Sequence, residues 1–334
     1  MPASHHRRTS WCRLLFAAVA VAVLLGGCDL RRETAAPTPR SADAAEQARQ
    51  RAAVESRDLF DLAHQSAVAA AEDLRPVLSR VGAHASAQLA QLGGVHVDPY
   101  ATPTGAGPSA TARDGGASAA TPLALNPTAF VARLYESYRT TRGAAAAVTD
   151  GRLARLLDSI SADRIIQAQR LAQLGAVKVP LLKTTEIPTS LPSGLAASAA
   201  VALVAAEDEA GYAFEVAAAL RSGAARYSAR ARAAIHRNRA QAWAEAAGVA
   251  TTSQDPRRAA YTIDRAAAAT HLPADVESAL AARYGSLVAT LSPSNRAVMI
   301  DAFADCASAA RVWGAPETAF PGLPERPADK VASS

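Results

Sequence analysis

Cysteines and aromatic residues are scarce in this chain. Of its 334 residues three are cysteines, and aromatic residues make up 5%. Cys12 and Cys28 lie in or beside an N-terminal segment typical of export signals, which leaves Cys306 alone in the rest of the chain. A single cysteine excludes an intrachain disulfide framework there. We expect Cys306 to act as a small apolar residue in a helix core.

Strong charge of either sign is also lacking. The formal net charge is +5, acidic and basic residues are interleaved, and no basic run carries interspersed aromatics. Proteins that bind nucleic acid gather positive charge on one face, so we expect no nucleic-acid partner. We find no glycine-rich phosphate loop, no nucleophile elbow and no cysteine–histidine pair. The sequence therefore predicts no catalytic residues and no cofactor.

Alanine, by contrast, is the commonest residue, and half of the chain is hydrophobic. Alanine has the highest helix propensity, and runs of β-branched residues are rare here. These two features predict an all-α fold. The length is enough for one large domain or two ordinary ones.

The N-terminus has the pattern of a lipoprotein signal peptide over residues 1–27. Three arginines precede an apolar run at 14–25, which is too short to span a bilayer comfortably. Leu25-Gly-Gly-Cys28 resembles the bacterial lipobox, in which the cysteine is acylated. Acyl chains on Cys28 would hold the protein on the extracytoplasmic face of the cell membrane, at about 0.8 kcal/mol for each buried methylene. The export route, Sec or twin-arginine, stays open.

The N-terminal half shows helical patterns separated by proline and glycine. Residues 28–43 are expected to be a flexible tether, and 44–177 an N-terminal helical module with a disordered loop at 95–125. Pro76 is expected to break the first helical pattern. The predicted helices are 44–74, 77–92, 126–141 and 149–174.

The C-terminal half is predicted to be a four-helix bundle at 194–325. A proline-rich linker at 178–193 precedes it, and a disordered tail at 326–334 follows. Its predicted helices are 194–221, 224–247, 273–291 and 293–313.

One carboxylate falls inside the seam of the first of these helices. Counting by three and four from Leu203 gives Glu207, Ala210, Phe214 and Ala217. An isolated buried charge is too costly, so Glu207 must be paired, hydrogen-bonded, protonated or bound to a metal.

Several residues of the C-terminal half match a known family. The matching residues are Ala206-Glu207, Tyr212, Phe214, His236-Arg-Asn-Arg239, Glu277 seven residues before Tyr284, Trp313 and Ala319-Phe-Pro-Gly-Leu323. With these residues, 194–325 resembles the ferritin-like domain of unknown function found in actinobacterial lipoproteins. The resemblance implies a ferritin-like bundle and an envelope location, with no known activity.

Ferritin-like di-metal sites take single glutamates from two helices and a Glu-x-x-His pair from each of the other two. Glu207 and Glu277 are placed as the single glutamates. His236 has Ala233 three positions before it, and the fourth helix has no histidine. We therefore expect no metal site, and Glu207, Glu277 and His236 stay low-ranked candidate ligands.

The alternative is that arginines neutralise these carboxylates. We expect Glu207 and Glu277 to form core ion pairs with Arg237, Arg239 or Arg311. The leading hypothesis is a non-catalytic, lipid-anchored binding or scaffold protein of the cell envelope. A metal-binding or redox protein using Glu207, Glu277 and His236 is the alternative. A third possibility, a small-ligand carrier, requires an apolar pocket between the two halves.

Overall fold

The computed structural model describes residues 42–96, 126–178, 182 and 186–326. Within these ranges the chain forms nine α-helices and a short 3₁₀ turn, with no strand, which confirms the all-α prediction. All of these helices belong to one compact unit that begins at Asp43. No helix in the described ranges is both long enough and apolar enough to cross a membrane. The predicted signal peptide, Cys28, most of the tether and most of the 95–125 loop lie outside the described residues, as does the tail from 327.

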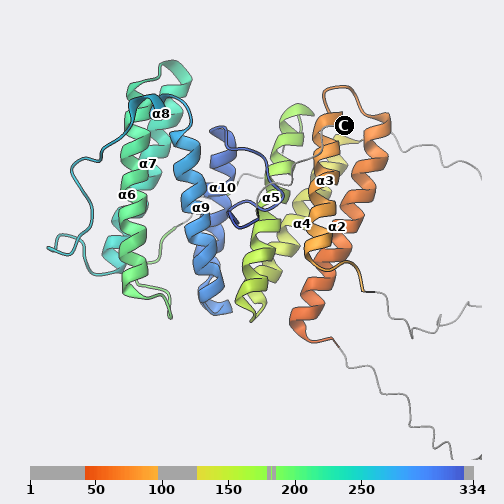
Figure 1. Cartoon of the computed structure of the whole chain (residues 1–334), viewed down its shortest axis with the longest axis horizontal. Helices are drawn as coiled ribbons and strands as arrows, with labels where there is room; N and C mark the ends of the chain where they lie inside the picture. The colour runs from red at the N-terminus through yellow and green to blue at the C-terminus, as the bar shows by residue number, and fades with distance from the viewer. Residues whose placement is uncertain (1–41, 97–125, 179–181, 183–185, 327–334) are drawn as a thin grey trace, which may run out of the picture. The chain divides into compact units, whose positions relative to one another are not determined.

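The helices pair into hairpins of neighbouring elements (Figure 1). In the N-terminal half α2 packs on α3 and α4 packs on α5; in the C-terminal half α6 packs on α7 and α9 packs on α10. The elements are α2 (Ala44–Ala69), α3 (Arg75–Gln91), α4 (Pro127–Ala147), α5 (Gly151–Leu174), α6 (Ala197–Ala219), α7 (Gly223–Ala246), α8 (Arg265–Ala269), α9 (Leu272–Thr290), η1 (Pro293–Asn295) and α10 (Ala297–Val312).

Side-chain caps and prolines set several helix starts. Asp43, Asn126 and Asp150 each accept a hydrogen bond from a backbone N–H in the first turn of the helix that follows. Pro76 lies in the first turn of α3, where the missing N–H costs nothing. The predicted break at Pro76 is confirmed, although α2 already ends at Ala69.

Two further predicted boundaries differ from the structure. Helix α4 continues to Ala147 instead of ending near residue 141, because the run of alanines after Gly143 favours helix. The last predicted helix divides into η1 and α10 at Arg296. The buried guanidinium of Arg296 donates to the carbonyls of Ala145 and Val148, which are among the free carbonyls at the end of α4.

Helices α6, α7, α9 and α10 form the C-terminal helical bundle, in which α6 contacts both α7 and α9. Helix α5 of the N-terminal half in turn contacts α9 and α10. One apolar core cluster extends through both halves, from Leu157 and Ile160 of α5 to Tyr284 of α9 and Phe303 of α10. The described part of the 178–193 linker adds Ile187 and Leu191 to the edge of this core.

Close backbone approach ties α5 to α9. A Cβ atom at Gly151 would lie 1.9 Å from the carbonyl oxygen of Ala289, so only glycine fits at this position. The first turn of α5 therefore packs directly on the last turn of α9.

After α10, the residues 315–326, which we call the C-terminal strap, lie along the N-terminal half. The Ser159 hydroxyl donates to the Pro321 carbonyl at 2.7 Å, and the Gln88 amide donates to the Ala319 carbonyl at 3.3 Å. Arg155 pairs with Glu325 at 2.7 Å. Bonds from α3 and α5 thus hold the strap in place.

Candidate functional site

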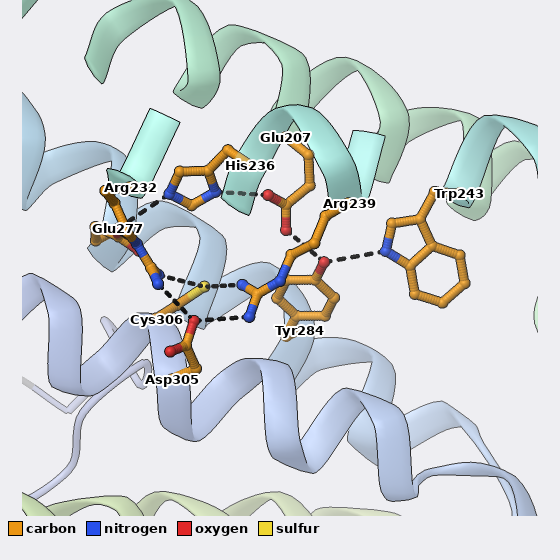
Figure 2. Close-up of polar contacts among 9 residues, drawn as sticks. All are labelled: Glu207, Arg232, His236, Arg239, Trp243, Glu277, Tyr284, Asp305 and Cys306. Atoms are coloured by element: carbon orange, nitrogen blue, oxygen red, sulfur yellow. Dashed lines mark hydrogen bonds and ion pairs between the residues drawn. The ribbon is translucent and has the colours of Figure 1, made fainter. Parts of the chain in front are cut away.

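A histidine bridges two carboxylates inside the C-terminal bundle (Figure 2). Nδ1 of His236, on α7, lies 2.6 Å from a carboxylate oxygen of Glu207 on α6. Its Nε2 lies 3.2 Å from an oxygen of Glu277 on α9. All three side chains are fully buried. Three helices therefore meet at one imidazole.

The second oxygen of Glu207 accepts a hydrogen bond from a tyrosine. The Tyr284 hydroxyl donates to Glu207 and itself accepts from the indole N–H of Trp243 at 3.1 Å (Figure 2). Burial and the charge of Glu207 raise the pKa of Tyr284 well above its ordinary value, so the phenol keeps its proton and remains a donor. Both oxygens of Glu207 thus have partners, although no arginine is bonded to it.

Two arginines of α7 neutralise the remaining carboxylates (Figure 2). Arg232 forms a two-bond fork with Glu277, one arm of which measures 2.7 Å. Arg232 and Arg239 each donate to the same oxygen of Asp305 on α10, both at 2.7 Å. Through these bonds α7 is joined to α9 and α10.

The pKa directions match this pairing. Burial opposes a charge on His236, but Glu277 and Glu207 outweigh burial and raise the pKa of the imidazole. Burial likewise disfavours ionised Glu277 and Asp305. The charges of Arg232 and His236 nevertheless lower the pKa of Glu277, and Arg232 and Arg239 lower that of Asp305. With His236 protonated, three positive groups face three carboxylates.

A family model described as "Domain of unknown function (DUF4439)" matches residues 198–325. This segment carries a DUF4439 domain. It covers α6 to α10 and nearly all of the strap, and hence every residue of the buried network. A search of curated proteins and a search of solved structures both gave no match.

The arginines expected to pair with the buried glutamates of the DUF4439 domain have other partners, so the predicted pairing is wrong. Arg237 pairs with Asp208 and Glu215, and Arg311 pairs with Glu317. Arg239 is in the network, but it binds Asp305. Glu277 instead pairs with Arg232, an arginine that was not among the predicted partners.

The register of α7 explains this miss. Arg232, His236, Arg239 and Trp243 are spaced by four, three and four residues, and all four are buried on one face of the helix. Arg237 follows His236 directly, so it points about 100° away around the helix. Extending the helical count backward from His236 would have found Arg232.

The candidate metal ligands Glu207, Glu277 and His236 do lie together, but their arrangement does not fit a metal centre. Both ring nitrogens of His236 face carboxylates, and in the protonated ring both are donors, so no ring lone pair is directed at a metal position. The guanidinium of Arg232 lies between Glu277 and Asp305, where a bridging cation would bind. In the described ranges no three or more histidine, cysteine or acidic side chains form a metal-binding group.

Cys306 lies fully buried in the network, as expected from its place in the helix. Its sulfur is 3.6 Å from Arg239 and 3.9 Å from Arg232. Burial and the charge of Glu277 raise the pKa of the thiol well above its ordinary value, in spite of these arginines. A protonated, enclosed thiol is a poor nucleophile.

A second buried cluster in the N-terminal half was missed by the sequence analysis. His84 of α3 binds Asp163 of α5 at 2.8 Å, and Gln88 binds the other oxygen of Asp163 at 2.7 Å. These partners are 75 or more residues apart in the sequence, so no local spacing pattern connects them.

Proposed function

We propose that the protein is a non-catalytic, lipid-anchored component of the cell envelope with a binding or scaffold role. In this proposal the DUF4439 domain is a ferritin-like bundle in which internal cations replace metal ions. The N-terminal signal and the lipobox ending at Cys28 support the location. The observation that carries the proposal is the neutralisation of Glu277 and Asp305 by Arg232.

The positive and negative groups of the buried network pair with one another without a ligand. Glu207 and Glu277 share His236, Glu277 and Asp305 share Arg232, and Asp305 also holds Arg239. A metal ion of charge +2 would have to displace a guanidinium or the imidazole proton. Arginine is not deprotonated under ordinary conditions, so displacement would leave a buried cation without its partner.

Metal analysis of the full chain, purified without chelator, tests this function. We expect iron, manganese and zinc far below one ion for each chain, with no difference between wild type and Glu207→Ala. Glu209→Ala, at an exposed position on α6, is the matched control. Stoichiometric metal that disappears in Glu207→Ala but remains in Glu209→Ala would establish the metal-binding alternative and overturn the proposal.

Fractionation tests the anchor. We expect the full chain to sediment with membranes and Cys28→Ser to lose both the acyl label and the membrane association. A membrane-bound Cys28→Ser protein would contradict lipid anchoring through this residue.

A further inference from the structure

A cavity of about 510 Å³ lies where the two halves meet, between α5, α9 and α10 on one side and the C-terminal strap on the other. This volume falls within the roughly 300–1,000 Å³ typical of sites for small ligands. The third hypothesis from the sequence required a pocket of this kind.

The walls of the cavity are largely apolar. Helices contribute Ile166, Ala281, Ala307 and Ala310, and the strap contributes Phe320 and Leu323. The short alanine side chains on α9 and α10 leave the space open. Gly322 allows the strap to pass over Phe303, since a Cβ atom there would lie 2.3 Å from the phenylalanine ring and the residue has a φ of +68°.

The two acidic residues on the wall already have partners within the protein. Asp163 accepts from Gln88 and Gln167 and binds His84. Glu317 pairs with Arg80 and with Arg311, the latter at 2.6 Å. These bonds leave no free acid to attract a positively charged ligand, and they hold the cavity in its shape before any ligand arrives.

One cation on the wall lacks an acidic partner. The guanidinium of Arg326 lies 5.7 Å from the centre of the Phe320 ring, and within the described residues no carboxylate is paired with it. Arg326 is half-buried and lines the cavity together with Phe320, so solvent only partly screens its charge. A guanidinium in this position favours a carboxylate or similar anion.

We propose that this cavity is a binding site for an amphipathic anion, whose apolar body fills the space beneath the strap and whose head group binds Arg326. This inference rests on the proposed binding role and gives that role a site and a ligand class. The apolar walls supply most of the affinity, and Arg326 selects the sign of the head group.

Calorimetric titration with three ligands of one chain length tests the proposal: decanoate, 1-decanol and decylamine, with the two ionic ligands below their micellar concentrations and decanol below its solubility limit. The protein is the full chain with Cys28→Ser, which keeps its own acyl chains out of the assay. We expect saturable one-to-one binding of decanoate, weaker binding of decanol and the weakest binding of decylamine.

Two variants assign the binding to the cavity. Arg326→Ala should weaken decanoate about fivefold to tenfold and leave decanol unchanged, since one charge-assisted contact is lost. Ala310→Phe should abolish binding of both by filling the space, whereas Ala231→Phe, at an exposed position on α7, should have no effect. If Ala310→Phe proves unfolded by circular dichroism, the Arg326→Ala comparison still decides.

Three outcomes would overturn the inference: no binding of decanoate, equal binding of decanoate and decylamine, or binding that neither variant alters. These outcomes would leave the metal and membrane tests untouched. Conversely, stoichiometric metal in the bundle would overturn the proposed function without changing the decanoate titration.

Discussion

Each half of the molecule buries an arginine, but the two halves stabilise that charge in different ways. In the C-terminal bundle, Arg232 is held by two carboxylates, Glu277 and Asp305. In the N-terminal half, Arg164 of α5 has one carboxylate partner, Glu55, at 2.8 Å.

Neutral groups supply most of the other bonds to Arg164. It donates to the hydroxyls of Ser56, at 2.9 Å, and of Thr141. Burial lowers the pKa of Arg164 to about 10, against the opposing charge of Glu55. For Arg232, by contrast, the charge of Glu277 outweighs burial and raises the pKa well above its ordinary value.

An acid in the N-terminal half shows the same contrast. Asp158 is fully buried, and neither of its oxygens has a hydrogen-bond partner in the described structure. Burial raises the pKa of Asp158 well above its ordinary value, with Arg142 and Arg296 opposing and Asp301 adding to the shift. Arg232 is thus neutralised by carboxylates, whereas Arg164 relies mainly on neutral groups and the pKa of Asp158 is raised by burial.

The largest expected effect comes from replacing each buried arginine by methionine. Arg232→Met leaves Glu277 and Asp305 with fewer partners in the core, and we expect a loss of about 3–5 kcal/mol in the free energy of unfolding. Arg164→Met leaves mainly neutral groups and a single carboxylate, Glu55, so we expect about 1–3 kcal/mol. Urea denaturation measures both.

Glu215→Gln is the matched control for this pair of variants. Glu215 pairs with Arg237 at the surface of the bundle, so its loss should cost under about 1 kcal/mol. Equal losses in the two methionine variants would show that the two arginines are stabilised alike, which would remove the contrast between the halves.

The effect expected from Asp158→Asn is smaller near pH 4 and grows with pH. Because the pKa of Asp158 is raised in the folded state, the wild type loses stability as the pH rises above the unfolded value of about 3.9, until the folded pKa is passed. The variant has no proton to release. Its stability relative to wild type should therefore grow by up to about 1.4 kcal/mol for each pH unit.

Denaturation of Asp158→Asn and wild type at several pH values measures this difference. Parallel stability curves from pH 4 to pH 8 would mean that Asp158 is ionised in the fold. Asp158 would then no longer differ from the carboxylates of the C-terminal bundle in its protonation state.

The smallest expected effect is the change in pH dependence caused by His236→Gln. The pKa of His236 is raised in the folded state, so the stability gained from its charge is complete below the unfolded pKa of about 6.5. It is lost as the pH rises through the folded pKa. The decline of wild-type stability over this window should be absent in the variant.

The measurement for His236→Gln is the unfolding free energy between pH 5 and pH 9, with His271→Gln as control. His271 is exposed and binds Asp275 on the same helix, so its removal should leave the curve nearly unchanged. A wild-type curve that does not decline more than that of His236→Gln would show that the bridging imidazole is neutral.

Much of the local structure could be predicted from the sequence. The starts of α4, α5 and α9 follow from Asn126, Asp150 and Pro273, because caps and prolines act within one turn. The burial of Glu207 followed from its place in an apolar seam. Each of these inferences depends on residues within a few positions of one another.

The partners of the buried charges could not be predicted in the same way. Whether Glu277 binds Arg232 or Arg239 depends on how α7 and α9 are rotated against each other. The two residues of the observed pair, Arg232 and Glu277, are 45 positions apart in the sequence. The pairing of Asp163 with His84 and the cavity under the strap likewise need helices from both halves.

The sequence by itself determined the helices, several of their starts and which faces are apolar, because propensity, capping and periodicity are local properties. Only the tertiary structure decided which cation neutralises which carboxylate and where space remains between the halves. The physical reason is that an ion pair needs two side chains within about 4 Å, and only packing brings distant helices that close.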